Sequence, residues 1–170
     1  MSDVLPWLEY KWSFDFPAGM YRAVLGRLRG TPARLEELLR GASREALERK
    51  PGGKWSVLEQ VGHLLILDEK LHAPRVEQYL RGETELMAAD MTNCATTEAS
   101  FNQRDPAGLL QEFRAAREKM LRRLDALTLA DAERVARHPR LQVPMRLVDL
   151  CYFCAEHDDH HVAVIHAMLK

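Results

Sequence analysis

The chain has 170 residues, with 24 Lys and Arg against 25 Asp and Glu, and 46% of its residues are hydrophobic. This length and composition predict one globular domain, residues 1–170, with a core of its own. A net charge of −1 without a basic cluster argues against nucleic acid or an anionic membrane surface as a partner. Uninterrupted apolar runs, such as 64–67, are far shorter than the roughly 20 residues of a membrane-spanning helix.

The N-terminal sequence has no signal-peptide pattern, and three cysteines do not make a disulfide framework. We therefore expect a cytoplasmic protein with reduced thiols. Cys151 and Cys154 lie between apolar residues of a predicted helix, which favours core packing over a redox motif.

Apolar residues recur at steps of three and four in four stretches, which predicts four helices and no strand. Four long helices in a chain of this size indicate an all-α four-helix bundle. The connection 83–104 is too long for a passive linker, and we expect it to cover one end of the bundle. The expected helices span about 18–40, 54–80, 106–127 (after an Asp105 N-cap), and from Pro144 nearly to the C-terminus.

Local signals set the details of these helices. Gly30-Thr31-Pro32 is expected to bend or restart the first helix, with Thr31 as N-cap. Ser56 and Glu59 have the spacing of a capping box, with Trp55 as its hydrophobic staple. Pro74 predicts a kink in the second helix.

The densest group of metal-capable side chains is Glu156–His161 in the last helix. His157 and His161 are four residues apart and lie on one helical face, within reach of a single ion. His160 is turned aside by its angular offset from His157. A buried imidazole pair needs either hydrogen-bond partners or a metal, and spacing alone leaves both interpretations open.

A third ligand must come from another helix, and helical periodicity does not decide among the candidates. His63 falls outside the centre of the apolar face of its helix, so it is either not a ligand or lies on a second buried face. Ile66 and Leu67 favour a second buried face. The candidates are His63, His72, His138 and His166.

Other charged and aromatic positions are interpreted as structural. Arg117 belongs to a set of alternating charges typical of a solvated helix face. Asp158 and Asp159 are expected to be solvated or paired on the surface, and Glu59 to be occupied by the capping box. The N-terminal aromatic residues are expected to pack over a groove of the bundle; they are Trp7, Tyr10, Trp12, Phe14 and Phe16.

The string KWSVLEQVGHL at 54–64, together with HDDHH at 157–161, resembles the DinB/YfiT-like metalloprotein superfamily, which is distinct from the DNA polymerase that shares the name. The resemblance covers nearly the whole chain and includes FDFP at 14–17, RLRGTPARL at 27–35, and Arg117 with Leu121. It implies an up-down-down-up four-helix bundle whose metal site takes one histidine from the second helix and two ligands from the fourth.

Carried over to this chain, the implied metal ligands are His63, His157 and His161. Some members of the superfamily have a glutamate as the middle ligand, where this chain has His157. Three neutral imidazoles suit zinc or nickel, and three protein ligands with one open position are typical of a catalytic site.

The resemblance further implies a metal-dependent enzyme that activates a thiol or water, of the thiol S-transferase or hydrolase type. Its partner would be a small-molecule substrate, for which a low-molecular-weight thiol is one candidate. A homodimer is compatible with the family resemblance and with the frequency of twofold pairs. The alternative is a non-catalytic, stress-associated or scaffold bundle with an absent or structural metal. A closed site or a fourth protein ligand would favour that alternative.

Overall fold

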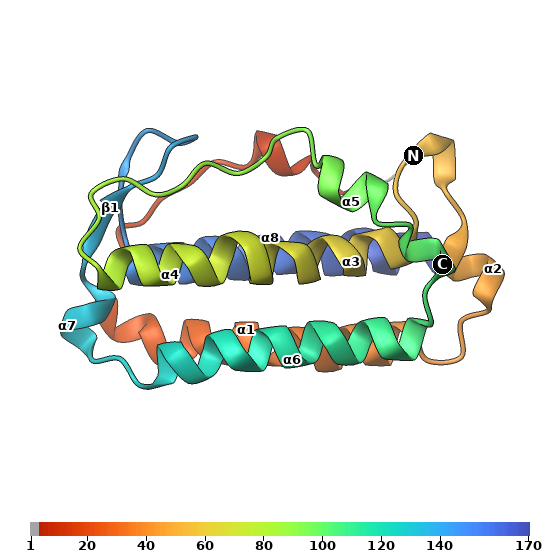
Figure 1. Cartoon of the computed structure of the whole chain (residues 1–170), viewed down its shortest axis with the longest axis horizontal. Coiled ribbons are helices and arrows are strands. Elements are labelled where there is room, and N and C mark those ends of the chain that lie inside the picture. The colour runs from red at the N-terminus through yellow and green to blue at the C-terminus, as the bar shows by residue number, and fades with distance from the viewer. Residues whose placement is uncertain (1–3) are drawn as a thin grey trace.

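The computed structural model describes residues 4–170. Figure 1 shows α1 and α8 running in one direction, with α3–α4 and α6 running in the other. The predicted up-down-down-up four-helix bundle is therefore confirmed. Both α1 and α3 pack against α6 and α8. The long segments are α1 (Tyr21–Leu39), α3 (Val57–Leu67) with α4 (Ala73–Leu80), α6 (Pro106–Asp125) and α8 (Leu147–Met168).

Short elements lie in the connections between these segments and before α1. A hairpin that the sequence did not predict precedes α8, and in it Ala136 pairs with Met145 across two antiparallel strands. Each strand has only three residues, too few for alternation to be recognised. The short elements are α2 (Arg44–Glu48), α5 (Cys94–Glu98), α7 (Leu129–Ala132), β1 (Val135–Arg137), β2 (Pro144–Arg146) and 3₁₀ turns at Trp7–Glu9, Ala18–Met20, Pro51–Gly53 and Phe101–Gln103.

The capping signals predicted at Ser56 and Asp105 are confirmed. Ser56 Oγ accepts a hydrogen bond from the Glu59 amide at 3.1 Å, and Glu59 Oε2 accepts one from the Ser56 amide at 2.8 Å. Asp105 caps α6 by accepting from the Gly108 amide at 2.7 Å. These bonds satisfy backbone donors that have no partner within the helix.

The predicted restart at Gly30-Thr31-Pro32, with Thr31 as N-cap, is wrong, because α1 is continuous through these residues. A proline inside a helix leaves the carbonyl four residues earlier without its usual donor. Here that carbonyl belongs to Leu28, and it accepts a hydrogen bond from Arg117 Nη1 at 2.9 Å. A side chain of α6 thus replaces the missing amide, and Thr31 is a buried residue of the helix instead of its N-cap.

At the predicted kink near Pro74, the structure has a π-helical turn just before the proline. A π-helical turn, Asp68–His72, joins α3 to α4, and Pro74 lies in the first turn of α4. At that position the missing amide of proline has little cost. Among residues 4–170, no helix is both long and apolar enough to cross a membrane.

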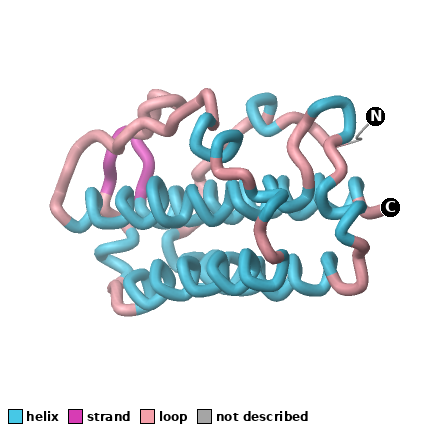
Figure 2. Tube along the Cα trace, turned by 45° about the vertical axis from the view of Figure 1, so that its right-hand side comes forward, coloured by secondary structure: helices cyan, strands magenta, loops and turns pink. Residues whose placement is uncertain are grey.

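The connection 83–104 runs along the bundle, over α4 and α3, instead of covering one end (Figures 1 and 2). At one end the Leu86 amide bonds to the Arg137 carbonyl of β1 at 3.0 Å. At the other end the buried ring of Phe101 packs on Gly62 of α3. Anchors at both ends explain why the connection follows the length of the helices.

Replacing Gly62 with alanine is expected to destabilise the protein, because the added methyl group would overlap the buried ring of Phe101. Overpacking of this kind costs about 1–3 kcal/mol of unfolding free energy, which urea denaturation would measure. The matched control is Gly26→Ala, at an exposed position within α1 where nothing lies within 4 Å of the new atom. That change is expected to be neutral or stabilising by up to about 1 kcal/mol. Equal effects of the two changes would contradict the packing argument.

Candidate metal centre

Three histidines converge where α3 packs against α8. His63 comes from α3, and His157 and His161 come from successive turns of α8. One ring nitrogen from each lies within 4.8 Å of the other two, and the two Nε2 atoms of α8 are 3.1 Å apart. Ligand nitrogens around a tetrahedral zinc ion are separated by about 3.3 Å, given zinc–nitrogen bonds of about 2.0–2.1 Å. The arrangement can therefore hold one divalent ion.

His63 lies on a second buried face of α3, as Ile66 and Leu67 suggested. All residues of this helix from Val57 to Leu65 are buried. α6 packs on one side of α3, and α5, in the connection 83–104, packs on α3 as well. The covering connection explains why periodicity alone placed His63 away from the centre of the apolar face.

Two neutral polar residues orient the rings. Thr96 Oγ1, from α5, lies 3.1 Å from His63 Nδ1, and Gln60 Oε1 pairs with His161 Nδ1. When the Gln60 carbonyl oxygen accepts this hydrogen bond, His161 carries its proton on Nδ1 and presents the lone pair of Nε2. Partners on the distal nitrogen are the usual means of holding a metal-binding imidazole in place.

The sequence did not identify Gln60 or Thr96 as partners of the histidines. Gln60 is a polar residue on an otherwise apolar helix one turn before His63, which is the one signal that could have found it. Glu59, the carboxylate considered for this role, bonds to Ser56 and to Lys50 at 2.6 Å. Its expected assignment to the capping box is confirmed.

His157 lacks the hydrogen bonds of an ordinary core histidine. Its Nδ1 atom is buried without a hydrogen-bond partner within the described residues, and its Nε2 atom faces only the Nε2 atom of His161. The ring of Trp7 lies edge-on to it, with centroids 4.8 Å apart. A buried polar nitrogen without a partner is costly, and hydrogen bonding within the described residues leaves Nδ1 of His157 unsatisfied.

Burial keeps these imidazoles neutral. Loss of hydration lowers the pKa of His63 to about 3, with a smaller contribution from His72 and His160. Desolvation likewise lowers the pKa of His157 and of His161 well below its usual value. At neutral pH all three rings therefore keep the lone pair that metal binding requires.

The three histidines line a pocket of about 540 Å³. His160 stays outside the three-histidine group, but its ring also lines this pocket, 5.2 Å from the ring of His161. Aromatic side chains and the connection 83–104 form much of the remaining wall, which includes Trp7, Trp55, Ala88, Asp90, Met91, Asn93 and Phe153. The ring of Trp55 lies 4.8 Å from that of His63.

The remaining candidate histidines lie outside the group. His72 Nδ1 is 3.2 Å from Asp68 Oδ1, and its ring is 6.3 Å from that of His157. His138 lies in the hairpin loop, where its Nε2 is 3.3 Å from Arg75 Nη1. His166 is exposed near the end of α8.

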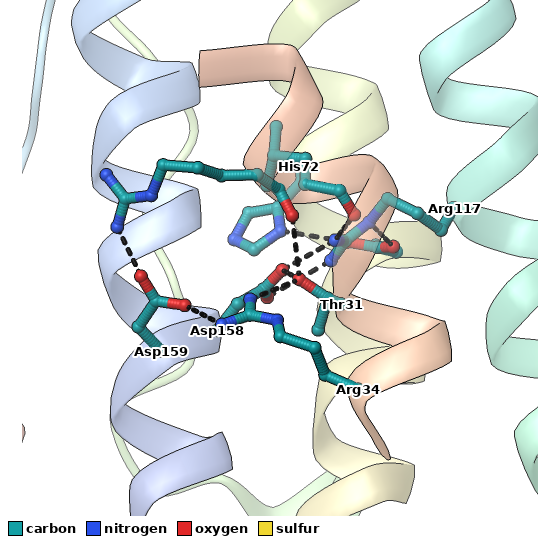
Figure 3. Close-up of polar contacts among 9 residues, drawn as sticks. Thr31, Arg34, His72, Arg117, Asp158 and Asp159 are labelled. Carbon is teal, nitrogen blue, oxygen red and sulfur yellow. Dashed lines mark hydrogen bonds and ion pairs between the residues drawn. The ribbon is translucent and has the colours of Figure 1, made fainter. Parts of the chain in front are cut away.

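The expectation that Arg117 lies on a solvated face is wrong, since this side chain is 1% exposed. Its guanidinium donates to Asp68 Oδ2 at 2.6 Å and to Asp158 Oδ2 at 2.5 Å. Figure 3 shows Arg117 reaching across to Asp158 of α8, beside Thr31 of α1. Thr31 Oγ1 donates to the same Asp158 oxygen at 2.7 Å.

Asp158 is likewise buried, not solvated, because it belongs to this network. Its neighbour Asp159 is paired near the surface as expected, with Arg34 Nη1 at 2.6 Å and with Arg27. Asp158 follows His157 directly in α8. The contacts of Asp158 therefore help to set the rotation of α8 that directs His157 into the pocket.

The change Arg117→Met should destabilise the protein strongly, because it leaves the carboxylates of Asp68 and Asp158 buried without their partner. Removing one member of a buried ionic network costs about 3–5 kcal/mol, measurable by urea denaturation. Arg122→Met, at an exposed position of the same helix, should change stability by less than about 0.5 kcal/mol. A similarly small effect at Arg117 would refute the structural importance of the network.

Without metal, the protein should lose stability as the pH falls below about 6. His63 has a pKa of about 3 when folded and about 6.5 when unfolded. Between these values the unfolded chain binds the additional proton, so acidification favours unfolding by about 1.4 kcal/mol per pH unit for this residue. Urea denaturation between pH 7 and pH 5, with a chelator present, measures this slope.

The variant His63→Asn should show a shallower slope, by about one proton. His166, an exposed histidine on α8, provides the control. The variant His166→Asn should keep the slope of the unmodified protein. An unchanged slope for His63→Asn would show that His63 is protonated in the folded state.

Comparisons with known proteins agree with this architecture. Among solved structures, YfiT from Bacillus subtilis superposes with a TM-score of 0.80 over 94% of this chain and 91% of that chain, at 23% sequence identity. YfiT is described as a probable metal-dependent hydrolase with an unusual four-helix bundle topology. None of the curated proteins compared with this chain matches it. The family model of the DinB superfamily matches residues 27–165, and the chain belongs to the DinB superfamily.

Proposed function

We propose that the protein is a divalent-metal-dependent enzyme that holds zinc or nickel at His63, His157 and His161. The observation that carries this proposal is the convergence of three buried, neutral imidazoles on the wall of an open pocket. Core histidines with a structural role would be expected to use their nitrogens in hydrogen bonds to other residue types. His157 does not.

The donor set limits the choice of ion and of chemistry. Three imidazoles without a thiolate or carboxylate suit zinc or nickel better than magnesium or calcium, which prefer oxygen. A bound ion of this kind supplies Lewis acidity, which lowers the pKa of a water or thiol at the open position. We therefore propose a hydrolase or a thiol S-transferase that uses a low-molecular-weight thiol. The description of YfiT as a probable metal-dependent hydrolase supports the first of these.

Neighbouring residues would hold the metal ligands in place and enclose the substrate. Thr96 and Gln60 keep the rings of His63 and His161 in fixed orientations. The rings of Trp7 and Trp55 border the pocket beside the histidines. Such apolar walls exclude bulk water and strengthen electrostatic interactions inside the pocket.

The pocket also separates this proposal from a scaffold with a structural metal. Structural zinc sites are closed by four protein ligands. The group found within the described residues supplies three, and the same three residues line a pocket large enough for a small molecule. The geometry therefore favours catalysis over a purely structural ion.

The first test is metal content, measured by plasma mass spectrometry on untagged protein. About one equivalent of zinc or nickel is expected, and it should be lost from His63→Ala, His157→Ala and His161→Ala because each removes one of three ligands. The exposed His166 offers a matched control on α8, and His166→Ala should retain the metal. Metal loss from the control alone, or retention by any of the three variants, would disprove this ligand set.

The second measurement compares ester hydrolysis and thiol transfer by the metal-loaded protein with the same assays on His161→Ala. Activity that requires both the metal and His161 would support the proposal. Protein that binds neither zinc nor nickel would instead support the non-catalytic bundle.

A further inference from the structure

The end of the pocket next to the hairpin loop carries two arginines that have no acidic partner. Arg75, in the first turn of α4, is 2% exposed, and Arg140 lies in the loop between β1 and β2. Both line the pocket that contains the three histidines. Neither forms an ion pair with a carboxylate within the described residues.

Arg75 is held by neutral groups alone. Its Nε and Nη2 atoms donate to the Met87 carbonyl at 3.1 and 2.9 Å, and its Nη1 atom lies 3.3 Å from His138 Nε2. A buried guanidinium is normally neutralised by a carboxylate or phosphate. The surroundings of Arg75 fix its position but leave its charge uncompensated.

The guanidinium group of Arg140 has fewer hydrogen-bond partners than that of Arg75. Its guanidinium lies over the ring of Phe153, with the central carbon 5.7 Å from the ring centroid, and it forms no hydrogen bond within residues 4–170. Its Nη2 atom is shielded from solvent without a partner. Burial lowers the pKa of Arg140 and is also the main cause of the lowered pKa of Arg75, to which the charge of Arg140 makes a smaller contribution.

His138 adds to the excess of donors. The Leu141 amide donates to His138 Nδ1 at 3.2 Å, while Arg75 Nη1 faces the Nε2 atom of the same ring. A neutral imidazole has a single lone pair available for accepting, so it cannot satisfy both donors. At this end of the pocket, one of these two donors therefore lacks an acceptor, as does Nη2 of Arg140.

The acidic side chain on the pocket wall does not correct this balance. Asp90 Oδ1 accepts from the amide and hydroxyl of Thr92, at 2.9 and 2.6 Å, and Asp90 Oδ2 accepts from the amide and thiol of Cys94. Both oxygens are thus used within their own turn. A group that brings its own negative charge would complete the wall.

We propose that the pocket binds a small molecule with an anionic group, a carboxylate or a phosphate, and that Arg140 and Arg75 receive this group. Phe153, on which Arg140 lies, is four residues before His157 in α8, which corresponds to about 6 Å along the helix axis. The anionic group would therefore lie about one helical turn from the three histidines. This identification of the ligand as the substrate rests on the proposed function, whereas anion binding itself needs no metal.

The test uses the full chain, freed of metal with a chelator, and three probes of matched shape. Benzoate and phenyl phosphate carry the anion, and benzamide is the neutral counterpart of benzoate. Binding is followed by the fluorescence of Trp7 and Trp55, which line the pocket. Benzoate or phenyl phosphate is expected to bind at least about tenfold more tightly than benzamide, because charge-assisted hydrogen bonds to arginine are strong. The stronger of the two anions identifies carboxylate or phosphate.

Arg140→Gln should abolish most of this preference, and Arg140→Lys should retain part of it. The control is Arg137→Gln, at an exposed arginine of the same hairpin, which should leave it unchanged. Equal binding of benzamide and both anions to the unmodified protein would overturn the inference without any variant. Equal losses from Arg140→Gln and Arg137→Gln would also overturn it, since overall charge would then explain the effect.

A parallel titration of the metal-loaded protein and of His161→Ala separates this inference from the proposed function. A preference for anions that appears only with metal, and disappears in His161→Ala, would mean that the ion itself receives the anion. That result would overturn the role of Arg140 while supporting the metal site. If the protein never binds metal but still prefers the anions, the result would support the role of Arg140 and overturn the proposed metal site.

Discussion

The buried guanidinium of Arg117 is the interaction on which the geometry of the bundle depends. From α6 it contacts Asp68 at the end of α3, Asp158 of α8 and the Leu28 carbonyl of α1. One side chain thus touches each of the other three long segments. Burying charges costs several kcal/mol per ion unless the pairing geometry and hydrogen bonds are nearly complete. Only placements of the four helices that satisfy Arg117 and both carboxylates together avoid this cost, so the network restricts how the helices can pack.

The same network positions the candidate metal centre. Adjacent residues of a helix point in directions about 100° apart, so Asp158, held in the interior, requires His157 to face the pocket. His161 follows one turn later on the same face. Asp68, the other carboxylate partner of Arg117, also lies 3.2 Å from His72 at the pocket. The π-helical turn that contains both residues is a feature often found at functional sites. The contacts of the buried ion network therefore also determine where the histidines lie.

Local signals were sufficient to predict the capping box, the start of α6 and the shared face of His157 and His161, because each depends on residues within one or two turns. The incorrect predictions have a common cause. Arg117 and Asp158 were interpreted as surface charges, yet their partners lie 49 and 41 residues away in the sequence. Pro32 predicted a break because nothing local could show that Arg117 would bond to the Leu28 carbonyl. Thr96 was missed for the same reason, since it meets His63 only after the connection 83–104 has folded along α3.

The charge balance of the pocket connects the metal proposal with the arginine pair. Three neutral imidazoles leave the full double charge of a divalent ion uncompensated, unlike ligand sets that contain thiolates or carboxylates. The carboxylates of Asp68 and Asp158 do not line the pocket, and Arg117 balances one of their two negative charges. Arg75 and Arg140 add further positive charge to the same pocket of about 540 Å³. In a partly desolvated space such charges interact more strongly than in water. A substrate with an anionic group would reduce the positive charge at the arginine end of the pocket, and a water or thiol that loses its proton would reduce it at the histidine end.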